Sequence, residues 1–228
     1  MRHNLNVKTV ATRNPRRLTR LEAQSLTRRR LLDAAADEFC EQGFRMASLT
    51  DVADRAGYTI GAVYSNFSSK DGLFLAVMRD RLPRIEGMLA AAFAADGQPA
   101  SGPTASVDER ITRELDSMEA REDSVPSNWW RLLSEFRIHA ATDPKTWAEL
   151  AESERRCREI IARYIERFAA DVGIILPVSA IEVAELTSAL SDGLRAAHAE
   201  GRSTMTSGQG LRLVVAALIE TSRRVGEA

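Results

Sequence analysis

Hydrophobic positions recur along most of the chain at the three- and four-residue spacing of one helix face, and no alternating strand pattern of useful length occurs. The first such stretch covers residues 19–42. Thr19 and Glu22 have the spacing of a capping box at its start, and Gly43 is expected to end it. The apolar positions on its buried face are Leu32, Ala35, Ala36 and Phe39. The pattern predicts an all-α protein.

Two short helices are predicted to follow this stretch. The first covers residues 49–56, with Ser48 as its N-cap and Gly57 closing it. The second covers residues 59–67 and is expected to be capped by the hydroxyl of Thr59. Short helices separated by a glycine are typical of a helix–turn–helix unit.

A fourth helix is predicted to open at Ser68 and Asp71, which repeat the capping spacing. Its apolar positions are Leu73, Phe74 and Val77. Pro83 lies inside this pattern and removes the hydrogen bond to the carbonyl of Arg79. We therefore expect a kink or a break near Leu82.

The remainder of the chain is predicted to be helical after one loop. Residues 96–106 are rich in Gly, Pro and Ser and form the only loop-like stretch of any length. Helices are expected at about 107–122, 127–141, 145–171, 179–200 and 208–225.

Composition indicates a globular protein. Of the 228 residues, 44% are hydrophobic and 28% are charged, which is enough apolar material for a core. The longest apolar runs fall short of the ~18 residues that a membrane span needs, so no membrane partner is expected. Cys40 and Cys157 are too few for a disulfide framework or a cysteine zinc site, and this favours a reduced, cytoplasmic protein.

The net charge of −1 conceals an uneven distribution. Residues 1–30 carry nine basic residues against a single acid, Glu22. A basic first part on an acidic remainder is typical of a protein that meets a polyanion, although a solvated basic tail has the same composition.

Residues 48–67, SLTDVADRAGYTIGAVYSNF, carry the most informative motif. Val52 and Ala53 lie on the inner face of the first short helix, and Val63 comes from the second helix to pack against them. Gly57 falls where the chain must turn sharply. The motif therefore predicts that the second helix is held out from the body so that its exposed face enters a DNA major groove.

The exposed side of this motif has groups suited to phosphate and base contacts. Ser48 and Thr59 are hydroxyls at helix N-termini, Tyr64 is an outward phenol, and Lys70 lies in the next helix's first turn. The candidates for contacts with base edges are Ile60, Ala62, Ser65 and Asn66. The predicted DNA-binding residues are Ser48, Thr50, Thr59, Ile60, Gly61, Ala62, Tyr64, Ser65, Asn66 and Lys70. A three-helix core without a nucleic-acid partner is the alternative.

From about Arg28 to Met78 the chain resembles the TetR-type transcriptional regulators, through RRRLLDAAADEFCEQGF and SLTDVADRAGYTIGAVYSNFSSKDGLF. The resemblance implies a dimeric, all-helical repressor whose C-terminal domain binds a small effector. It also implies DNA contacts at the positions Ser48, Thr59, Gly61, Tyr64 and Lys70. Many relatives have histidine where this chain has Ser65 and Asn66, so the base preference stays open.

Residues 1–18 form a basic segment with five basic residues and no acid. Such a segment is expected to be disordered alone. Its arginines, with Arg20, could enter a minor groove or lie along phosphates. They could equally be a solvated tail, or lie ahead of the true start, and the sequence leaves these readings open.

The last two predicted helices have apolar stripes suited to a subunit interface. The stripes are Val183, Leu186, Leu190, Leu194 and Ala197, and Leu211, Val214, Val215, Leu218 and Val225. Two such helices from each subunit would form a four-helix bundle about a two-fold axis, matching a palindromic operator. The alternative is that both helices pack only on their own subunit.

A cavity for a hydrophobic or aromatic effector is expected among aromatic residues of the middle region. The candidate lining residues are Met88, Phe93, Met118, Trp129, Trp130, Phe136, His139 and Trp147. A ligand there would tilt the helix that contains Pro83 and change the spacing of the recognition helices. Plain core packing is the alternative for each of them.

Enzymatic motifs are missing from the sequence. The chain has no G-x-S-x-G elbow and no G-x-x-x-x-G-K phosphate loop, and His3, His139 and His198 have no metal spacing. We therefore expect neither an enzyme nor a cofactor or metal.

These observations predict a homodimeric DNA-binding regulator in three parts: a basic arm (1–18), a helix–turn–helix domain (19–82) and an effector-binding and dimerisation domain (83–228). Its expected partners are an operator duplex and a small-molecule effector that releases the repressor. The alternatives are a helical ligand-binding protein or enzyme that only borrows the N-terminal fold, and an effector-free architectural DNA binder.

Overall fold

The computed structural model describes residues 19–96, 106–123 and 128–226, with side chains for all of these except 92–96 and 223–226. This part of the chain contains nine helices and no strand, as the hydrophobic pattern predicted. The helices are α1 (Arg20–Met46), α2 (Leu49–Ala56), α3 (Ile60–Asn66), α4 (Lys70–Asp96), α5 (Val107–Asp123), α6 (Trp129–Ala140), α7 (Pro144–Val172), α8 (Ala180–Ala199) and α9 (Ser207–Gly226). Within the described ranges, no helix has the length and apolar character to cross a membrane.

Several predictions concern residues that lie outside this description. The basic segment 1–18 is one of them, and most of the predicted loop 96–106 is another. The side chains of Phe93 and Val225 also lie outside it. The five helices predicted after residue 106 each begin and end within two residues of the observed positions.

The first helix begins and breaks where its sequence indicates. Thr19 and Glu22 form both hydrogen bonds of a capping box. Gly43 leaves the helical conformation with φ 79° and ψ 165°, a region open almost only to glycine. The backbone N–H of the next residue, Phe44, donates to the carboxylate of Glu135 on α6 at 2.9 Å. The break in α1 is therefore also the point where α6 attaches.

The caps of the next three helices follow the prediction in part. Ser48 accepts hydrogen bonds from two backbone amides at the start of α2, and Gly57 ends α2 in the left-handed conformation with φ 74°. Thr59 occupies the N-cap position of α3, but its side chain makes no capping hydrogen bond. At α4 the predicted cap Ser68 is wrong by one residue, because the hydroxyl of Ser69 accepts from the amide of Gly72 at 3.0 Å.

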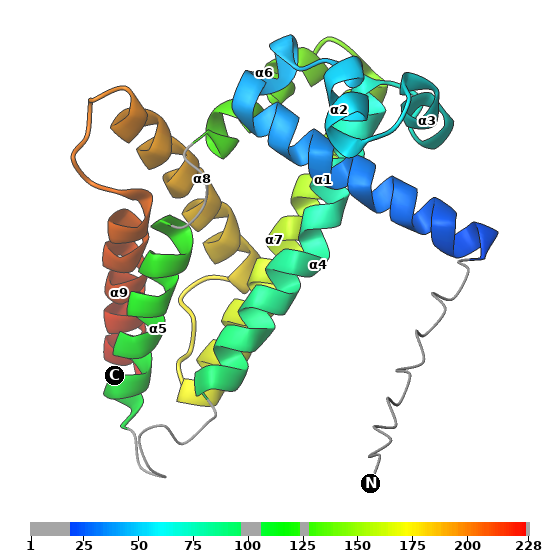
Figure 1. Ribbon diagram of the computed structural model, residues 1–228. Helices are drawn as coiled ribbons and strands as arrows, with labels where there is room; N and C mark the ends of the chain where they lie inside the picture. The colour runs from blue at the N-terminus through cyan, green and yellow to red at the C-terminus, as the bar shows by residue number, and fades with distance from the viewer. Residues whose placement is uncertain (1–18, 97–105, 124–127, 227–228) are drawn as a thin grey trace, which may run out of the picture.

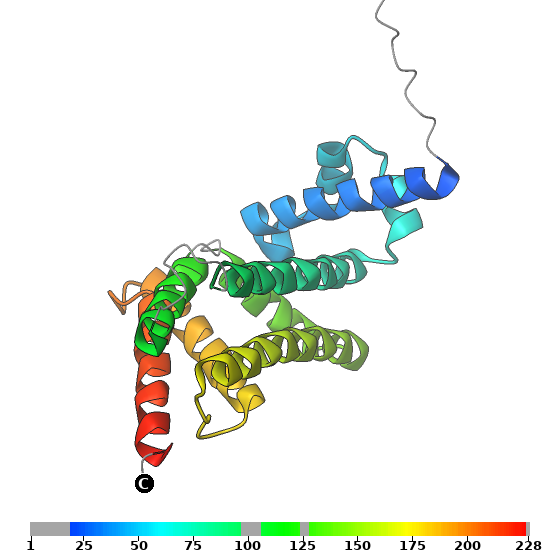
Figure 2. The same ribbon diagram turned by 90° about the horizontal axis from the view of Figure 1, so that it is seen from below.

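Pro83 does not break α4, which runs on to Asp96. The predicted break near Leu82 is therefore wrong, and the kink expected as its alternative stays a prediction. Proline removes one backbone hydrogen bond, and the packing of the flanking turns outweighs that local loss. Helix α4 lies beside α7 over much of its length, and both views of the ribbon show the two side by side (Figures 1 and 2).

The largest core unites the N-terminal helices with α6. The ring of Phe74 lies 4.0 Å from that of Phe136, and the ring of Phe44 lies 4.7 Å from Phe136 in an edge-to-face contact, both measured between centroids. Phe136 is fully buried here, together with Leu132. It is therefore part of the structural core.

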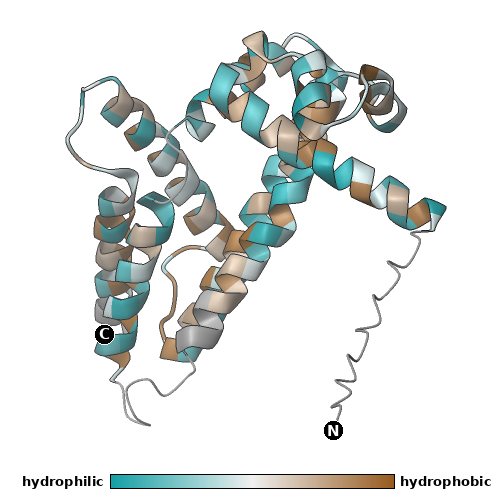
Figure 3. Cartoon of the chain, viewed as in Figure 1, coloured by the Kyte–Doolittle hydropathy of each residue, from teal (hydrophilic) through white to brown (hydrophobic). Residues whose placement is uncertain are grey.

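The other helices form a second packed region. Helix α5 lies against α9, and α8 packs on both α7 and α9 (Figure 1). Ile111, Leu115 and Val172 form a small core there, with Met118 packed against it. Hydrophobic and hydrophilic residues alternate along α5 and α9 (Figure 3), as expected for helices with one buried face.

Replacing Gly43 tests the junction between α1 and α6. We expect Gly43→Ala to lower the free energy of unfolding by about 1–3 kcal/mol, because its φ is strained for alanine. In addition, a Cβ there would come 2.8 Å from a carboxylate oxygen of Glu135. Urea denaturation measures the change.

The matched control for this measurement is Gly87→Ala, because Gly87 lies inside α4 with open space around a Cβ. It should leave stability unchanged or raise it by up to about 1 kcal/mol. Equal stability of the two variants would contradict the role assigned to Gly43.

Candidate nucleic-acid interface

Helices α2 and α3 form a helix–turn–helix held together by small and β-branched side chains. Val52 and Ala53 of α2 and Val63 of α3 are 0–1% exposed. Gly57 makes the turn between them in the left-handed conformation. Because Val63 faces inward, the opposite side of α3 is left to solvent.

The outward face of α3 combines apolar and hydroxyl groups. Tyr64 is 58% exposed and Ile60 is 38% exposed, although both are large apolar groups that usually gain from burial. The predicted contacts Thr59, Gly61 and Ser65 are exposed, and Ala62 is half-buried. Helix α3 lies at the edge of the molecule, away from α5 and α9 (Figure 1).

The start of α2 presents two of the predicted hydroxyls. The oxygen of Ser48 accepts from the amides of Thr50 and Asp51 at 3.1 and 3.4 Å. Its own proton remains available to an acceptor, because a hydroxyl donates as well as accepts. Thr50 is exposed in the first turn, where the helix dipole favours an anion.

Ser65 and Asn66 are less available to bases than the sequence indicated. The hydroxyl of Ser65 donates to the carbonyl of Ala62 at 2.9 Å, and the amide of Asn66 donates to the same carbonyl at 2.8 Å. The two side chains therefore satisfy the last turn of α3. The backbone carbonyl of Asn66 is also occupied, by the guanidinium of Arg28 at 3.0 Å.

Lys70 is held by the protein. Its ammonium donates to the carbonyl of Arg45 at 3.0 Å and lies 5.0 Å from the centroid of the Phe44 ring. Desolvation lowers the pKa of Lys70 from its ordinary value, and the neighbouring Asp71 acts in the opposite direction. The lysine expected to reach for a DNA phosphate therefore also caps the end of α1.

The first turns of α1 add positive charge beside this unit. They extend beyond the packed helices (Figures 1 and 2). Arg20, Arg28 and Arg30 are exposed there. Arg29 is also exposed but pairs with Asp80 at 3.2 Å.

The residues predicted to line an effector cavity lie in separate places. Phe136 and Trp129 belong to the N-terminal core, whereas Met118 packs near α9. Trp147 is 47% exposed and Met88 is 43% exposed. The structure therefore does not gather these residues around one cavity. Helix periodicity indicated which side of each helix faces inward, but it could not indicate which helices contact one another.

His139 and Trp130, the other two candidates on α6, have different contacts. Nε2 of His139 lies 3.1 Å from the carboxylate of Asp71, and its ring lies 4.8 Å from that of Phe44. Trp130 is half-buried on α6, and its backbone carbonyl accepts the hydroxyl of Ser134 at 2.8 Å.

The connecting role of α6 was missed at the sequence level. Glu135 and His139 bind the N-terminal helices, as described above, and Arg81 of α4 lies 3.8 Å from the centroid of the Trp129 ring. On its other side, Arg137 pairs with Glu154 of α7 and Asp192 of α8 at 2.8 and 2.7 Å. The only sequence signal was the density of charged and aromatic residues in 129–140.

Comparisons with known families match both parts of the chain. Residues 31–77 match the model of bacterial regulatory proteins of the tetR family. Residues 107–222 match a model described as the C-terminal part of BetI-type transcriptional repressors. Together the two models cover most of the described residues.

Individual proteins give the same result. The transcriptional repressor BepR of Brucella suis is 42% identical over 77 residues, which are 33% of this chain and 36% of BepR. The matches to BepR, SrpR and BetI span about a third of each relative's length.

Solved structures match over most of both chains. A transcriptional regulator from Rhodococcus has a TM-score of 0.61 at 24% identity, covering 86% of this chain and 97% of its own. A Saccharomonospora viridis regulator solved in complex with choline has a TM-score of 0.61 at 21% identity, covering 86% and 96%. At these identities the likeness shows the fold.

Replacing Lys70 separates its structural contact from any role with DNA. We expect Lys70→Met to lower the free energy of unfolding by about 1 kcal/mol, because the Arg45 carbonyl loses its charged donor. Lys145→Met is the control, because Lys145 is exposed on α7, and it should stay within about 0.5 kcal/mol of the parent. Thermal unfolding in a phosphate-free buffer distinguishes the two, and equal losses would contradict the capping role.

Proposed function

Because the chain belongs to the tetR family of bacterial regulatory proteins, we propose that it is a homodimeric repressor that binds a palindromic operator and leaves it when a small effector binds. Family membership makes it a DNA-binding regulator of transcription and not an enzyme. The dimer, the operator and the effector are the proposed part. A regulator of this kind acts on the chromosome, and we place it in the cytoplasm.

The exposed face of α3 is the observation that carries this proposal. The outward face of this short helix carries apolar and hydroxyl groups that are not covered by other helices, and Val63 packs on its inner side. Such a face fits the major groove of DNA. Thr59, Ile60, Gly61, Ala62 and Tyr64 are proposed to meet the DNA directly.

The remaining contacts support that docking. Ser48 and Thr50 are proposed to hold phosphates at the start of α2. Ser65 and Lys70 would add to this through the bonding capacity left beside their internal hydrogen bonds. Asn66 would need to release Ala62 before it could read a base.

A dimer through α8 and α9 supports palindromic recognition. Leu186 is 57% exposed and Leu213 is 62% exposed on these helices. Leu190, Leu194, Val214 and Leu218 are only half-buried within the subunit. A second copy would cover them and present two α3 helices ~34 Å apart, one turn of DNA.

The effector is proposed to bind in the C-terminal domain. A protein of similar fold was solved in complex with choline, which supports ligand binding by this fold. In this chain the hydroxyl of Tyr164 is buried within this domain. It lies near the Glu114–Arg121 ion pair, and burial raises its pKa above the ordinary value. A buried hydroxyl beside an ion pair is suited to contact a polar ligand.

The direct experiment is selection of bound sequences from random duplex DNA by the full chain. We expect an inverted repeat whose half-sites are one helical turn apart. A gel shift with the selected duplex then gives affinities at several salt concentrations. A helical ligand-binding protein would select no sequence, and an architectural binder would select none but still bind DNA strongly.

Tyr64→Ala is expected to weaken binding to the selected duplex about 5- to 150-fold, because one good contact contributes about 1–3 kcal/mol. The control is Trp147→Ala, which removes another exposed aromatic side chain on α7 and should leave the affinity unchanged. Equal affinities of the two variants would contradict docking through α3.

Leu186→Glu is expected to produce a monomer, because it places a charge in the proposed apolar interface. Sedimentation velocity measures the oligomeric state. Ile138→Glu is the control, because Ile138 is 75% exposed on α6, which carries no part of the proposed interface, and should leave a dimer intact. A dimer in both variants would exclude the α8–α9 interface.

A further inference from the structure

Helix α3 depends on its neighbours for its position. It has seven residues, which is too short for a helix to be stable on its own in water. Its buried side chain, Val63, belongs to the N-terminal core, and its N-cap Thr59 makes no capping hydrogen bond through its side chain. A single buried side chain near the middle of a helix does not determine the tilt of that helix. The direction of α3 is therefore set by the contacts at its two ends.

The first end of α3 is held at Tyr58, the residue before the N-cap. Tyr58 is half-buried against the N-terminal core. Its hydroxyl is hydrogen-bonded to the hydroxyl of Thr27 on α1 at 3.3 Å. The hydroxyl of Thr27 is also hydrogen-bonded to the carbonyl of Ala23 in the preceding turn of α1, at 3.0 Å, and this holds its rotamer. The start of α3 is thereby connected to α1.

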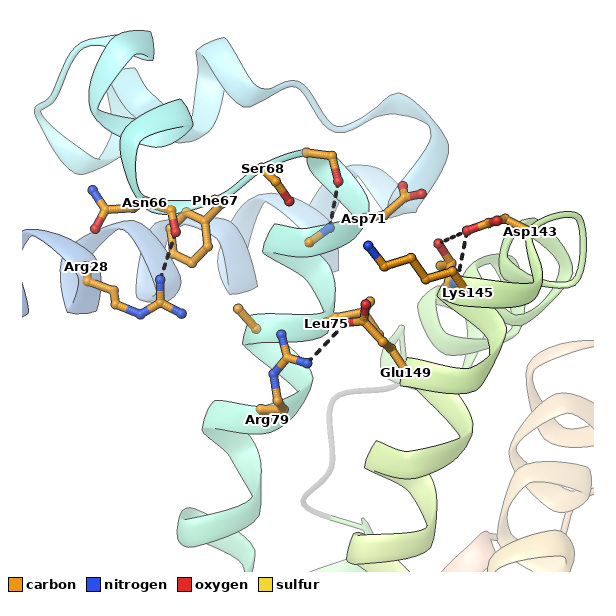
Figure 4. Close-up of a pocket in the computed structure, with 14 residues that line it drawn as sticks. Arg28, Asn66, Phe67, Ser68, Asp71, Leu75, Arg79, Asp143, Lys145 and Glu149 are labelled. Carbon is orange, nitrogen blue, oxygen red and sulfur yellow. Dashed lines mark hydrogen bonds and ion pairs between the residues drawn. The ribbon is translucent and has the colours of Figure 1, made fainter.

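The other end of α3 is held by Arg28, the next residue of α1. Its guanidinium donates to the backbone carbonyl of Asn66, the last residue of α3, at 3.0 Å. It also lies 4.4 Å from the centroid of the Phe67 ring, which is 5% exposed. Figure 4 shows the side chain of Arg28 directed at both residues. Because a helix C-terminus carries partial negative charge and α3 has no basic residue in its own last turn, Arg28 supplies the complementary charge from α1.

The part of α1 that carries Thr27 and Arg28 is fixed by the core. Leu31 and Leu32 follow in the next turn and are 0% and 8% exposed. Close-packed side chains hold this turn in place, so the two contacts with α3 leave α1 at a defined spacing. Consecutive residues of one anchored helix thus hold both ends of α3.

We propose that Thr27 and Arg28 are positioning residues for DNA recognition, which set the tilt of α3 in the major groove and thereby the sequence that the protein selects. The inference rests on the proposed docking of α3 on DNA. A helix at another tilt still meets phosphates, but it no longer presents Tyr64 and its neighbours to the same base edges. Loss of either contact therefore lowers specific binding more than non-specific binding.

The experiment measures gel shifts of the full chain with two duplexes of equal length, the selected one and a scrambled one, at several salt concentrations. Arg28→Met removes the hydrogen bond to Asn66 and keeps an apolar stem beside Phe67. Tyr58→Phe removes only the hydroxyl that is bonded to Thr27. Each variant is expected to lower the ratio of specific to non-specific affinity at least about threefold. Tyr58→Phe changes no charge, so the salt dependence of its specific binding should equal that of the parent.

Arg30→Met is the matched control. It removes the same charge from α1 two residues further along, on the opposite side of the helix, where Arg30 is exposed. It should leave the ratio of the two affinities unchanged. Circular dichroism and thermal unfolding show whether all three variants are folded at the assay temperature, because a purely structural role would lower stability and leave the ratio as it is.

Two results would overturn the proposal. In the first, Arg28→Met weakens binding to both duplexes equally and reduces the salt slope by about one per subunit, which would make Arg28 a direct phosphate contact. In the second, Arg28→Met and Tyr58→Phe keep the ratio of the parent while Tyr64→Ala loses it, so that α3 docks without these contacts. If Tyr64→Ala also binds as the parent does, the proposed docking of α3 fails, and the positioning role fails with it.

Discussion

The contact of Phe136 with Phe44 and Phe74 fixes the position of the N-terminal helices relative to the remainder of the chain. Its ring lies 4.7 and 4.0 Å from theirs, and all three are nearly or fully buried. Interlocked rings resist sliding, because each has a preferred edge or face toward the next. The orientation of α3 is thus tied to α6.

Charged contacts continue this connection on the other side of α6. Arg137 reaches both α7 and α8, and α8 carries part of the proposed subunit interface. A shift of α8 would therefore be carried through one salt-bridged helix to the aromatic core and the helix–turn–helix unit. Rigid helices joined by discrete contacts are suited to such coupling.

Features set by local chemistry could be predicted from the sequence. The capping box at Thr19, the N-cap Ser48 and the turns at Gly43 and Gly57 depend on residues within one helical turn, and all appear as predicted. The resemblance at residues 28–78 likewise rests on a continuous motif. The cap of α4 was placed one residue early, since adjacent serines fit the same pattern.

Features set by distant partners could not be predicted. Periodicity shows that Phe136 faces inward but not that it meets Phe74, which is far away in sequence. The hydrogen bond of Lys70 to the Arg45 carbonyl has no sequence signal either, because it depends on where α1 ends in space.

The carboxylate of Glu135 at the break in α1 also links the two parts of the chain in evolution. Exchange of C-terminal domains between related regulators by recombination in α4 would separate the backbone N–H of Phe44 from its acceptor, so an evolutionary chimaera would have to inherit the α6 glutamate together with the N-terminal helices.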